Sequence, residues 1–146
     1  MDVELAAVGW GTVELERGEH ELAPRRFVHA ADEELLGAVA SVSRDRDPPI
    51  VLLAPRTEGR LAAALARMGE GPVAIYVSLG QEPLDRALAE LQHRGLRTRR
   101  GMGPFGAIAL VLGRRSTLTG GPREPDVLVV GNGWRHGPDE RVPSRQ

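Results

Sequence analysis

The second half of the chain alternates short apolar segments with one amphipathic segment, and this order restricts the fold more than any other feature. Residues 73–79, VAIYVSL, are rich in β-branched and aromatic side chains and predict a buried strand. The segment 82–93 places Leu84, Leu88 and Leu91 on one face of a helix. Further strands are predicted at 96–99, 107–112 and 127–130, with a Gly-rich loop at 101–106 and another loop at 116–125. The predicted order is therefore β-α-β-β-β.

The first half allows the same order, with one segment left open between two structures. Strands are predicted at 3–8, 26–29, 38–43 and 50–53, whereas 12–24 is compatible with a strand or a short helix. A helix follows at 57–68, and we expect Thr57 to cap it. Its predicted buried face carries Leu61, Leu65 and Met68. The two halves thus indicate a repeat of about 60–70 residues that this helix joins.

The composition excludes several classes of chemistry. The 146 residues include no cysteine and no lysine, which excludes disulfides, thiolate nucleophiles and Schiff-base lysines. A formal net charge of −1 argues against a dedicated nucleic-acid partner. No signal peptide is recognisable, and no apolar run approaches the roughly 18 residues of a membrane span, so we expect a cytoplasmic protein without a membrane partner.

A series of sequence features resembles one protein family. The series comprises Gly-Glu-Gly at 69–71 before a strand, Arg-Gly-Leu at 94–96 behind a helix, a Gly-rich approach to 108–112, Arg-Ser-Thr at 115–117, Gly-Gly at 120–121 and a closing VLVV strand. This order is similar to that of methylmalonyl-CoA epimerases and related glyoxalase-like proteins of the vicinal oxygen chelate superfamily, which includes the bleomycin resistance proteins. The resemblance implies an α+β fold in which two tandem βαβββ modules form a cupped, half-open barrel. We expect the first module at 1–56, a linker helix at 57–71, the second module at 72–131 and a disordered tail at 132–146.

The resemblance also implies a divalent metal, held by four ligands in the cup, in the family members that are enzymes. The ligand positions fall on Ala7, Val51, Ala74 and Val130 of this chain. Aliphatic side chains cannot coordinate a metal ion. We therefore expect neither a metal nor another cofactor here.

Four residues are candidate ligand-binding residues of the cup. Tyr76 follows Ala74 by two positions, so strand alternation places both on one face, where Tyr76 either contacts a ligand or packs in the core. Trp10 follows the first strand and either lines the rim or packs against a neighbour. Phe105 belongs to the predicted loop over the cup mouth, and His29 is the one histidine in a predicted strand.

Two classes of function compete, beside a third possibility that the chain is a degenerate subunit that stabilises a partner. In the first, the protein binds a small, largely apolar molecule in its cup or in a dimer cleft, as sequestration and resistance proteins do, without a metal. In the second, it is an epimerase-like or lyase-like enzyme for an acyl-CoA or a 2-oxo compound and works by acid–base chemistry. The family resemblance implies a homodimer in either case. An apolar cup with one or two polar groups would favour binding, whereas two convergent titratable groups would favour the enzyme.

Overall fold

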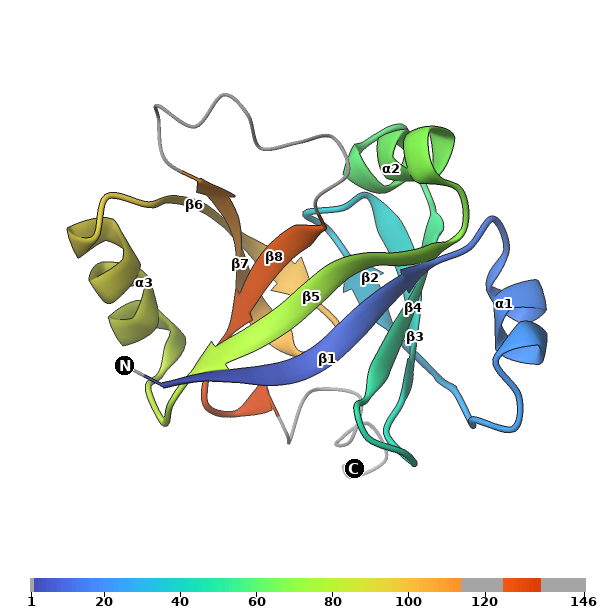
Figure 1. Ribbon diagram of the computed structural model, residues 1–146, viewed down its shortest axis with the longest axis horizontal. Coiled ribbons are helices and arrows are strands. Elements are labelled where there is room, and N and C mark those ends of the chain that lie inside the picture. The colour runs from blue at the N-terminus through green and yellow to red at the C-terminus, as the bar shows by residue number, and fades with distance from the viewer. Residues whose placement is uncertain (1, 114–124, 135–146) are drawn as a thin grey trace, which may run out of the picture.

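Two similar strand–helix–strand modules make up the computed structural model, which describes residues 2–113 and 125–134 (Figure 1). The first module contains β1 (Val3–Gly11), α1 (Leu15–Glu21), β2 (Val28–Glu33), β3 (Ala38–Ser43) and β4 (Ile50–Pro55). The second contains β5 (Gly71–Leu79), α3 (Leu84–His93), β6 (Arg97–Gly103), β7 (Gly106–Gly113) and β8 (Asp126–Val130). The helix α2 (Arg60–Met68) connects the modules. Both therefore have the predicted β-α-β-β-β order.

One eight-stranded sheet joins the modules, in the order β2-β3-β4-β1-β5-β8-β7-β6. Within each module the first strand runs parallel to the last, as β1 does to β4 and β5 does to β8. The modules meet where β1 pairs antiparallel with β5 in the middle of the sheet. The repeat that residue identities only suggest is thus explicit in the strand topology.

The curled sheet brings its two outermost strands together. The backbone N–H of Glu34, directly after β2, donates to the carbonyl oxygen of Met102 in β6 at 3.0 Å. The N–H of Met102 donates in return to Oε1 of Glu34 at 3.1 Å. These two bonds join the sheet edges at one point, so the sheet encloses a cup rather than lying open.

Each face of the sheet has its own apolar cluster. The inner cluster contains side chains from both modules, including Val42, Leu53, Ile108 and Leu110. The outer cluster of the second module packs α3 against the sheet through Leu84, Ala87, Leu88 and Leu91, so the predicted helix face is the buried one. In Figure 1, α3 and α1 lie at opposite ends of the sheet.

Several local predictions need correction. The segment 12–24, left open between a strand and a helix, contains the helix α1. Gly18 within it is buried, and a larger residue would not fit there, since a Cβ would lie 2.9 Å from Cγ2 of Thr12. Thr57 does not cap α2, since Gly59 is the N-cap residue and no side chain caps the helix. The predicted Gly-rich loop at 101–106 is wrong, because β6 and β7 continue into it and leave only a tight turn.

The strand predicted at 26–29 has the wrong bounds, since β2 spans Val28–Glu33. The remaining local predictions either agree with the structure or lie outside the residues it describes. Leu61 is buried on α2, and Leu65 and Met68 pack beside it, as predicted. Most of the predicted loop at 116–125 and of the predicted tail at 132–146 lies outside the described residues. Among the helices of the described segments, none is long and apolar enough to cross a membrane.

Candidate functional site

The inner surface of the cup is almost entirely apolar. Ala7, Val51, Ala74 and Val130 are at most 1% exposed and belong to the same inner cluster. Gly9 pairs with both Ala74 and Val51, which places elements of both modules next to one another here. A Cβ at Gly9 would lie 2.9 Å from Cβ of Ala74, so the strands approach too closely there for a larger residue. These positions contribute packing and no polar atoms to the cup.

One carboxyl group and one phenol interrupt this apolar surface. Glu33 and Tyr76 are both 0% exposed, and the phenol of Tyr76 donates to Oε1 of Glu33 at 2.6 Å. The N–H of Leu35 donates a longer bond of 3.4 Å to Oε2 of Glu33. Because Glu33 belongs to β2 and Tyr76 to β5, this hydrogen bond connects the two modules inside the cup.

An irregularity in β2 turns Glu33 inward. Ala30 pairs with Ala40, whereas Glu33 pairs with Ala38. Three residue steps along β2 therefore lie opposite two steps along β3. The extra residue is the signature of a β-bulge, and it shifts the side chains that follow to the other face. Regular alternation from Ala30 would point residue 33 away from the cup. The bulge therefore places the carboxyl group inside.

Burial controls the protonation of this pair. Removal from water raises the pKa of Glu33 to about 7, although the hydrogen bonds from Tyr76 and from the N–H of Leu35 lower it in part. Burial also raises the pKa of the Tyr76 phenol well above its usual value, and the neighbouring carboxyl group adds to that rise. Tyr76 is thus a neutral donor, while Glu33 changes its charge near neutral pH.

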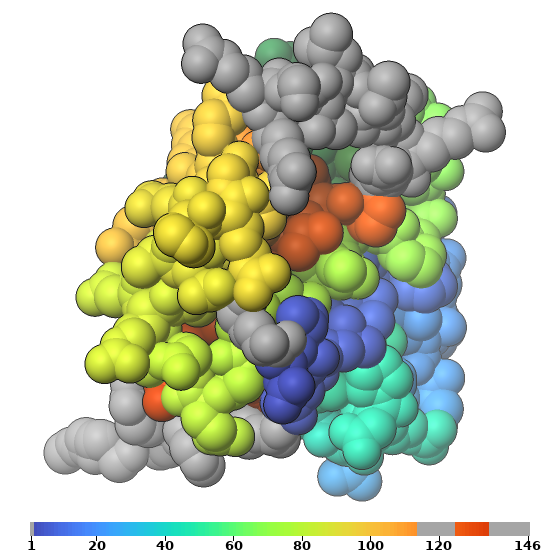
Figure 2. All heavy atoms as spheres, turned by 60° about the vertical axis from the view of Figure 1, so that its left-hand side comes forward, coloured from blue at the N-terminus to red at the C-terminus, as the bar shows by residue number. Residues whose placement is uncertain are grey.

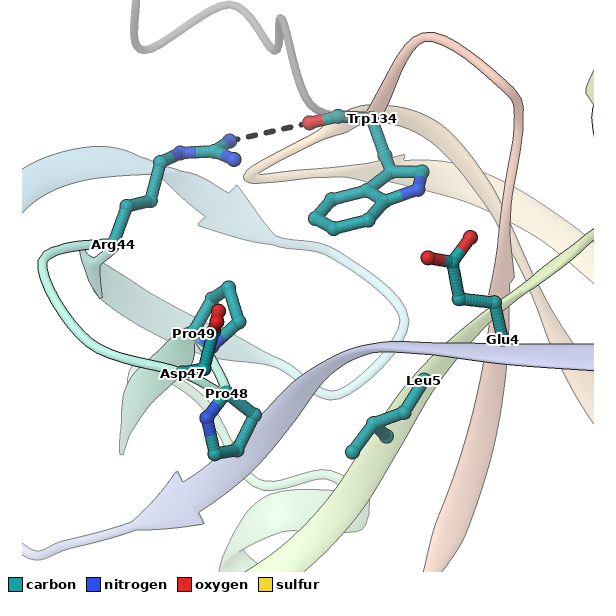
Figure 3. A pocket seen from close by; sticks show the side chains of 7 residues that line it. All are labelled: Glu4, Leu5, Arg44, Asp47, Pro48, Pro49 and Trp134. Carbon is teal, nitrogen blue, oxygen red and sulfur yellow. Dashed lines mark hydrogen bonds between the residues drawn. The ribbon is translucent and has the colours of Figure 1, made fainter.

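A chain of aromatic contacts leads from Tyr76 toward the surface. The ring of Phe105 stands edge-on to Tyr76 with centroids 5.5 Å apart, and Trp134 stands edge-on to Phe105 at 6.1 Å. The Arg44 guanidinium lies 5.0 Å from the centroid of the Phe105 ring and donates to the carbonyl oxygen of Trp134 at 3.2 Å. Trp134 and Arg44 then line a surface pocket of about 660 Å³ (Figure 3).

The structure brings together two of the four predicted site residues. Tyr76 and Phe105 touch inside the cup. Trp10 pairs with Leu52, and this places it on the face opposite to Gly9 and Gly11, outside the cup. His29 pairs with Ser41, whose hydroxyl donates to Glu19 of α1, so His29 is exposed on the outer face as well. A role of any of the four in ligand binding stays a prediction.

Sequence reasoning missed three residues of this region. Glu33 lies in the acidic stretch ADEELL, which is typical of a solvated turn, and no residue pattern in that stretch predicts a bulge. Trp134 belongs to the segment that we predicted to be disordered, yet it is 6% exposed and packs on Phe105. Arg44 occupies a charged turn, and only the structure shows that its guanidinium faces Phe105.

The described residues do not fit a metal centre. Within 2–113 and 125–134, no group of three or more His, Cys, Asp or Glu side chains lies close enough together to hold a metal ion. Among the carboxyl groups of these described residues, that of Glu33 is the one that is buried. We therefore derive no chemical step through a metal.

The paired modules and the enclosed cup define a protein of the glyoxalase-like fold, and this confirms the predicted fold class. The fold is that of methylmalonyl-CoA epimerase from Mycobacterium tuberculosis, at a TM-score of 0.68 and 19% identity over 88% of this chain and 87% of that one. A variant of the Streptomyces coelicolor methylmalonyl-CoA epimerase in complex with 2-nitronate-propionyl-CoA gives a TM-score of 0.67 at 16% identity, over 87% and 94% of the two chains.

A hypothetical protein from Bacillus halodurans has the same fold. Its TM-score is 0.63 at 15% identity, over 88% of this chain and 94% of that one. No protein-family model and no curated protein matches the sequence. At these identities the similarities establish the fold, and they leave the function to be inferred from the site.

Proposed function

We propose that this chain is a binding protein that holds a small, largely apolar molecule in its cup without a metal ion. The observation that carries the proposal is the composition of the inner surface, where aliphatic and aromatic side chains surround one polar pair, Glu33 and Tyr76. A small-molecule site usually has an apolar lining with a few well-placed polar groups. The side chains of the inner cluster pack against one another and are at most 7% exposed, so a ligand must displace some of them to reach the pair.

The polar pair supplies the anchor in this proposal. Because the pKa of Glu33 is about 7, its carboxyl group is present in both protonation states near neutral pH. The ionised form accepts a hydrogen bond from an N–H or O–H of a ligand, and the protonated form donates to a carbonyl oxygen. The ligand's remaining surface would be buried against the aromatic rings of Tyr76 and Phe105, and burial of apolar surface would supply most of the affinity.

A fluorescence titration with N-phenyl-1-naphthylamine tests this proposal. This probe is apolar, carries one N–H donor and becomes fluorescent in an apolar site. We expect saturable enhancement with the full-length protein and weaker binding by Glu33→Gln, which cannot become a carboxylate. The matched control is Glu16→Gln on α1, which makes the same change at an exposed position away from the cup and should bind as the wild type does. Equal binding by all three proteins, or no saturable enhancement, would overturn the proposal.

Metal analysis and native mass spectrometry complete this test. We expect no stoichiometric metal after incubation with Zn²⁺, Co²⁺, Mn²⁺ or Ni²⁺ and removal of the excess. A retained stoichiometric metal would refute metal-free binding. The same spectra report the oligomeric state, for which the family resemblance predicts a dimer.

A second function, proton transfer at carbon, is favoured by one specific observation. A buried carboxyl group with a pKa of about 7 has the basicity of a general base, and two of the solved structures with this fold are named methylmalonyl-CoA epimerase. In such a reaction the Glu33 carboxylate would take the proton next to the thioester carbonyl of an acyl-CoA and return it to the same carbon of the enolate.

Deuterium exchange separates the two functions. The protein is incubated with methylmalonyl-CoA in D₂O, and loss of the α-proton signal is followed by NMR. The binding proposal predicts no exchange above the protein-free rate. If the wild type catalyses the exchange and Glu33→Gln abolishes it, the protein is an enzyme and the binding proposal is wrong.

A further inference from the structure

The outer face of the central strands is apolar, although no helix of the described segments covers it. In Figure 1, β1 and β5 cross the front of the molecule between α3 on one side and α1 on the other. Figure 2 shows the first residues of β1, in dark blue, at the surface. Antiparallel strands that turn one face to water usually carry polar residues on that face. The outward side chains of β1 do not follow this rule.

The pairing of β1 with β5 shows which side chains point outward. Directly paired residues of antiparallel strands point to the same face of a sheet. Val3 pairs with Leu79, and Leu79 belongs to the outer cluster under α3. Leu5 pairs with Val77 of the same cluster. Val3 is nevertheless 63% exposed and Leu5 is 46% exposed, so the outer cluster continues into solvent beyond the part that α3 covers.

The apolar surface extends along β1 toward α1. Val8 pairs with Ile75, which packs beside the outer cluster, and Trp10 lies on the outer face as well. We call this surface the apolar strip. It comprises six outward side chains that are exposed or partly exposed, namely Val3, Leu5, Val8, Trp10, Ile75 and Val127. None of these side chains is charged.

The dimensions of the apolar strip fit a contact with another protein. From Val3 to Trp10 a strand extends roughly 23 Å, and three neighbouring strands make a strip roughly 10–15 Å wide. An area of roughly 300 Å² matches the apolar core of an interface that covers about 800 Å² per partner, with the flanking helices as its polar rim. A small molecule needs a concave site, whereas the apolar strip lies on the convex side of the curled sheet.

The charges beside the apolar strip favour a second copy of this chain as the partner. At one end, residues 14–21, which include α1, contain four glutamates and one arginine. At the other end, residues 84–100, which include α3 and the start of β6, contain five arginines and two acidic residues. A copy turned by 180° about an axis along the central strands places the acidic end of each chain next to the basic end of the other. An axis across the strands would bring the two acidic ends together.

We propose that the apolar strip is the interface between two copies of this chain, with α1 of each copy facing α3 of its partner. Burial of the strip supplies the apolar contact, and the opposite charges of the two ends set the orientation. The family resemblance predicts a dimer without naming a surface, whereas this inference assigns the surface and the orientation. It is independent of the proposed function, because the strip lies on the opposite face of the sheet from Glu33 and Tyr76.

Sedimentation equilibrium of the full-length protein tests the surface. We expect a dimer for the wild type. Val3→Asp and Leu5→Asp should each raise the dimer dissociation constant roughly ten-fold or more, because each would bury an unpaired charge in the contact. Val28→Asp is the matched control, since Val28 is 59% exposed but pairs with Val42 of the inner cluster and so points away from the strip. A monomeric wild type, dimers unaffected by both strip variants, or equal weakening by Val28→Asp would overturn the inference.

Cross-linking tests the orientation. The chain contains no cysteine, so an introduced thiol is the one that reacts. Glu16→Cys places a thiol on α1 and Arg86→Cys places one on α3, both at exposed positions. With a short bismaleimide, a mixture of the two variants should give far more cross-linked dimer than either variant alone, and Leu5→Asp in both should remove it. Equal cross-linking of each variant alone would overturn the orientation, and a yield unchanged by Leu5→Asp would overturn the surface.

Discussion

The phenol of Tyr76 and the carboxyl group of Glu33 are joined by a hydrogen bond of 2.6 Å that connects the two modules in the interior of the cup. Both side chains are 0% exposed. The hydrogen bond joins residues 43 positions apart in the chain, so it forms only when β2 and β5 have taken their places in the sheet. Protonation of Glu33 is consequently linked to folding of the whole molecule.

The pH dependence of stability should carry the signature of Glu33. The pKa rises from an ordinary 4.5 to about 7 on folding. Between these values the unfolded chain is ionised while the folded protein keeps its proton, so the free energy of unfolding falls as the pH rises. Urea unfolding from pH 4.5 to 7 should show this loss, roughly 3 kcal/mol in all from this group, and it should end above pH 7.

Glu33→Gln should remove that slope. Other groups titrate over neighbouring ranges, including Asp45 and Glu70, whose lowered pKa values make their contribution fall as the pH is lowered. The quantity to compare is therefore the free energy of unfolding of the wild type minus that of the variant at each pH, because the contributions of the other groups cancel in this difference. A difference that is constant from pH 4.5 to 7 would show that Glu33 does not hold a proton in the folded state.

Tyr76→Phe should raise the pKa of Glu33 further. The phenol lowers that pKa by donating to the carboxylate, and phenylalanine cannot replace the bond. The loss of stability should be about 1 kcal/mol at pH 5, where the partner is neutral, and larger at pH 8, within the roughly 1–3 kcal/mol of a bond to a charged group. Chemical unfolding at both pH values measures this. Equal losses at the two pH values would mean that the phenol does not stabilise the ionised carboxylate.

The order of elements was predictable from the sequence because it depends on local periodicity. The strand Ala38–Ser43 and the buried face of α3 follow from side-chain patterns alone. Tyr76 was placed in the cup by strand alternation from Ala74, and alternation holds in β5. Glu33 was missed because the predicted strand ended at residue 29, whereas β2 continues to Glu33. A bulge also interrupts the alternation in β2, and a bulge depends on the pairing partner rather than on the strand's own residues.

The end of the β6–β7 hairpin, residues 101–106, was mistaken for a loop for a related reason. Glycines usually weaken strands, yet here they permit close approaches from another part of the fold. A Cβ at Gly101 would lie 2.8 Å from Cγ of Leu35, and a Cβ at Gly103 would lie 2.7 Å from Oε1 of Glu33. Those neighbours come from the opposite edge of the sheet and are invisible to any local pattern.

Gly103→Ala should therefore disturb the buried carboxyl group. The added methyl group would overlap Oε1 of Glu33 and lie 3.0 Å from Cδ1 of Ile108, and this overpacking should cost about 1–3 kcal/mol. Gly133→Ala is the matched control, because a Cβ there meets nothing within 4 Å. Thermal unfolding of the two variants tests the contrast. Similar melting temperatures would mean that the sheet edges adjust freely around Glu33.

A double-mutant cycle should detect the contact between Arg44 and Phe105. The guanidinium lies 5.0 Å from the ring centroid, a distance at which a cation and an aromatic face attract each other. Phe105→Leu keeps an apolar side chain but removes the ring, and Arg44→Gln removes the charge. Their combined loss of unfolding free energy should differ from the sum of the single losses by about 0.5–1 kcal/mol. The bond from Arg44 to the Trp134 carbonyl is lost in both variants that carry Arg44→Gln, so it cancels in the cycle.

A second cycle, which pairs Arg46→Gln with Phe105→Leu, is the control. Arg46 lies on the same turn and is exposed, so its coupling to Phe105 should be close to zero. Equal coupling in the two cycles would show that the effect comes from the charge of the turn and not from the stacked guanidinium.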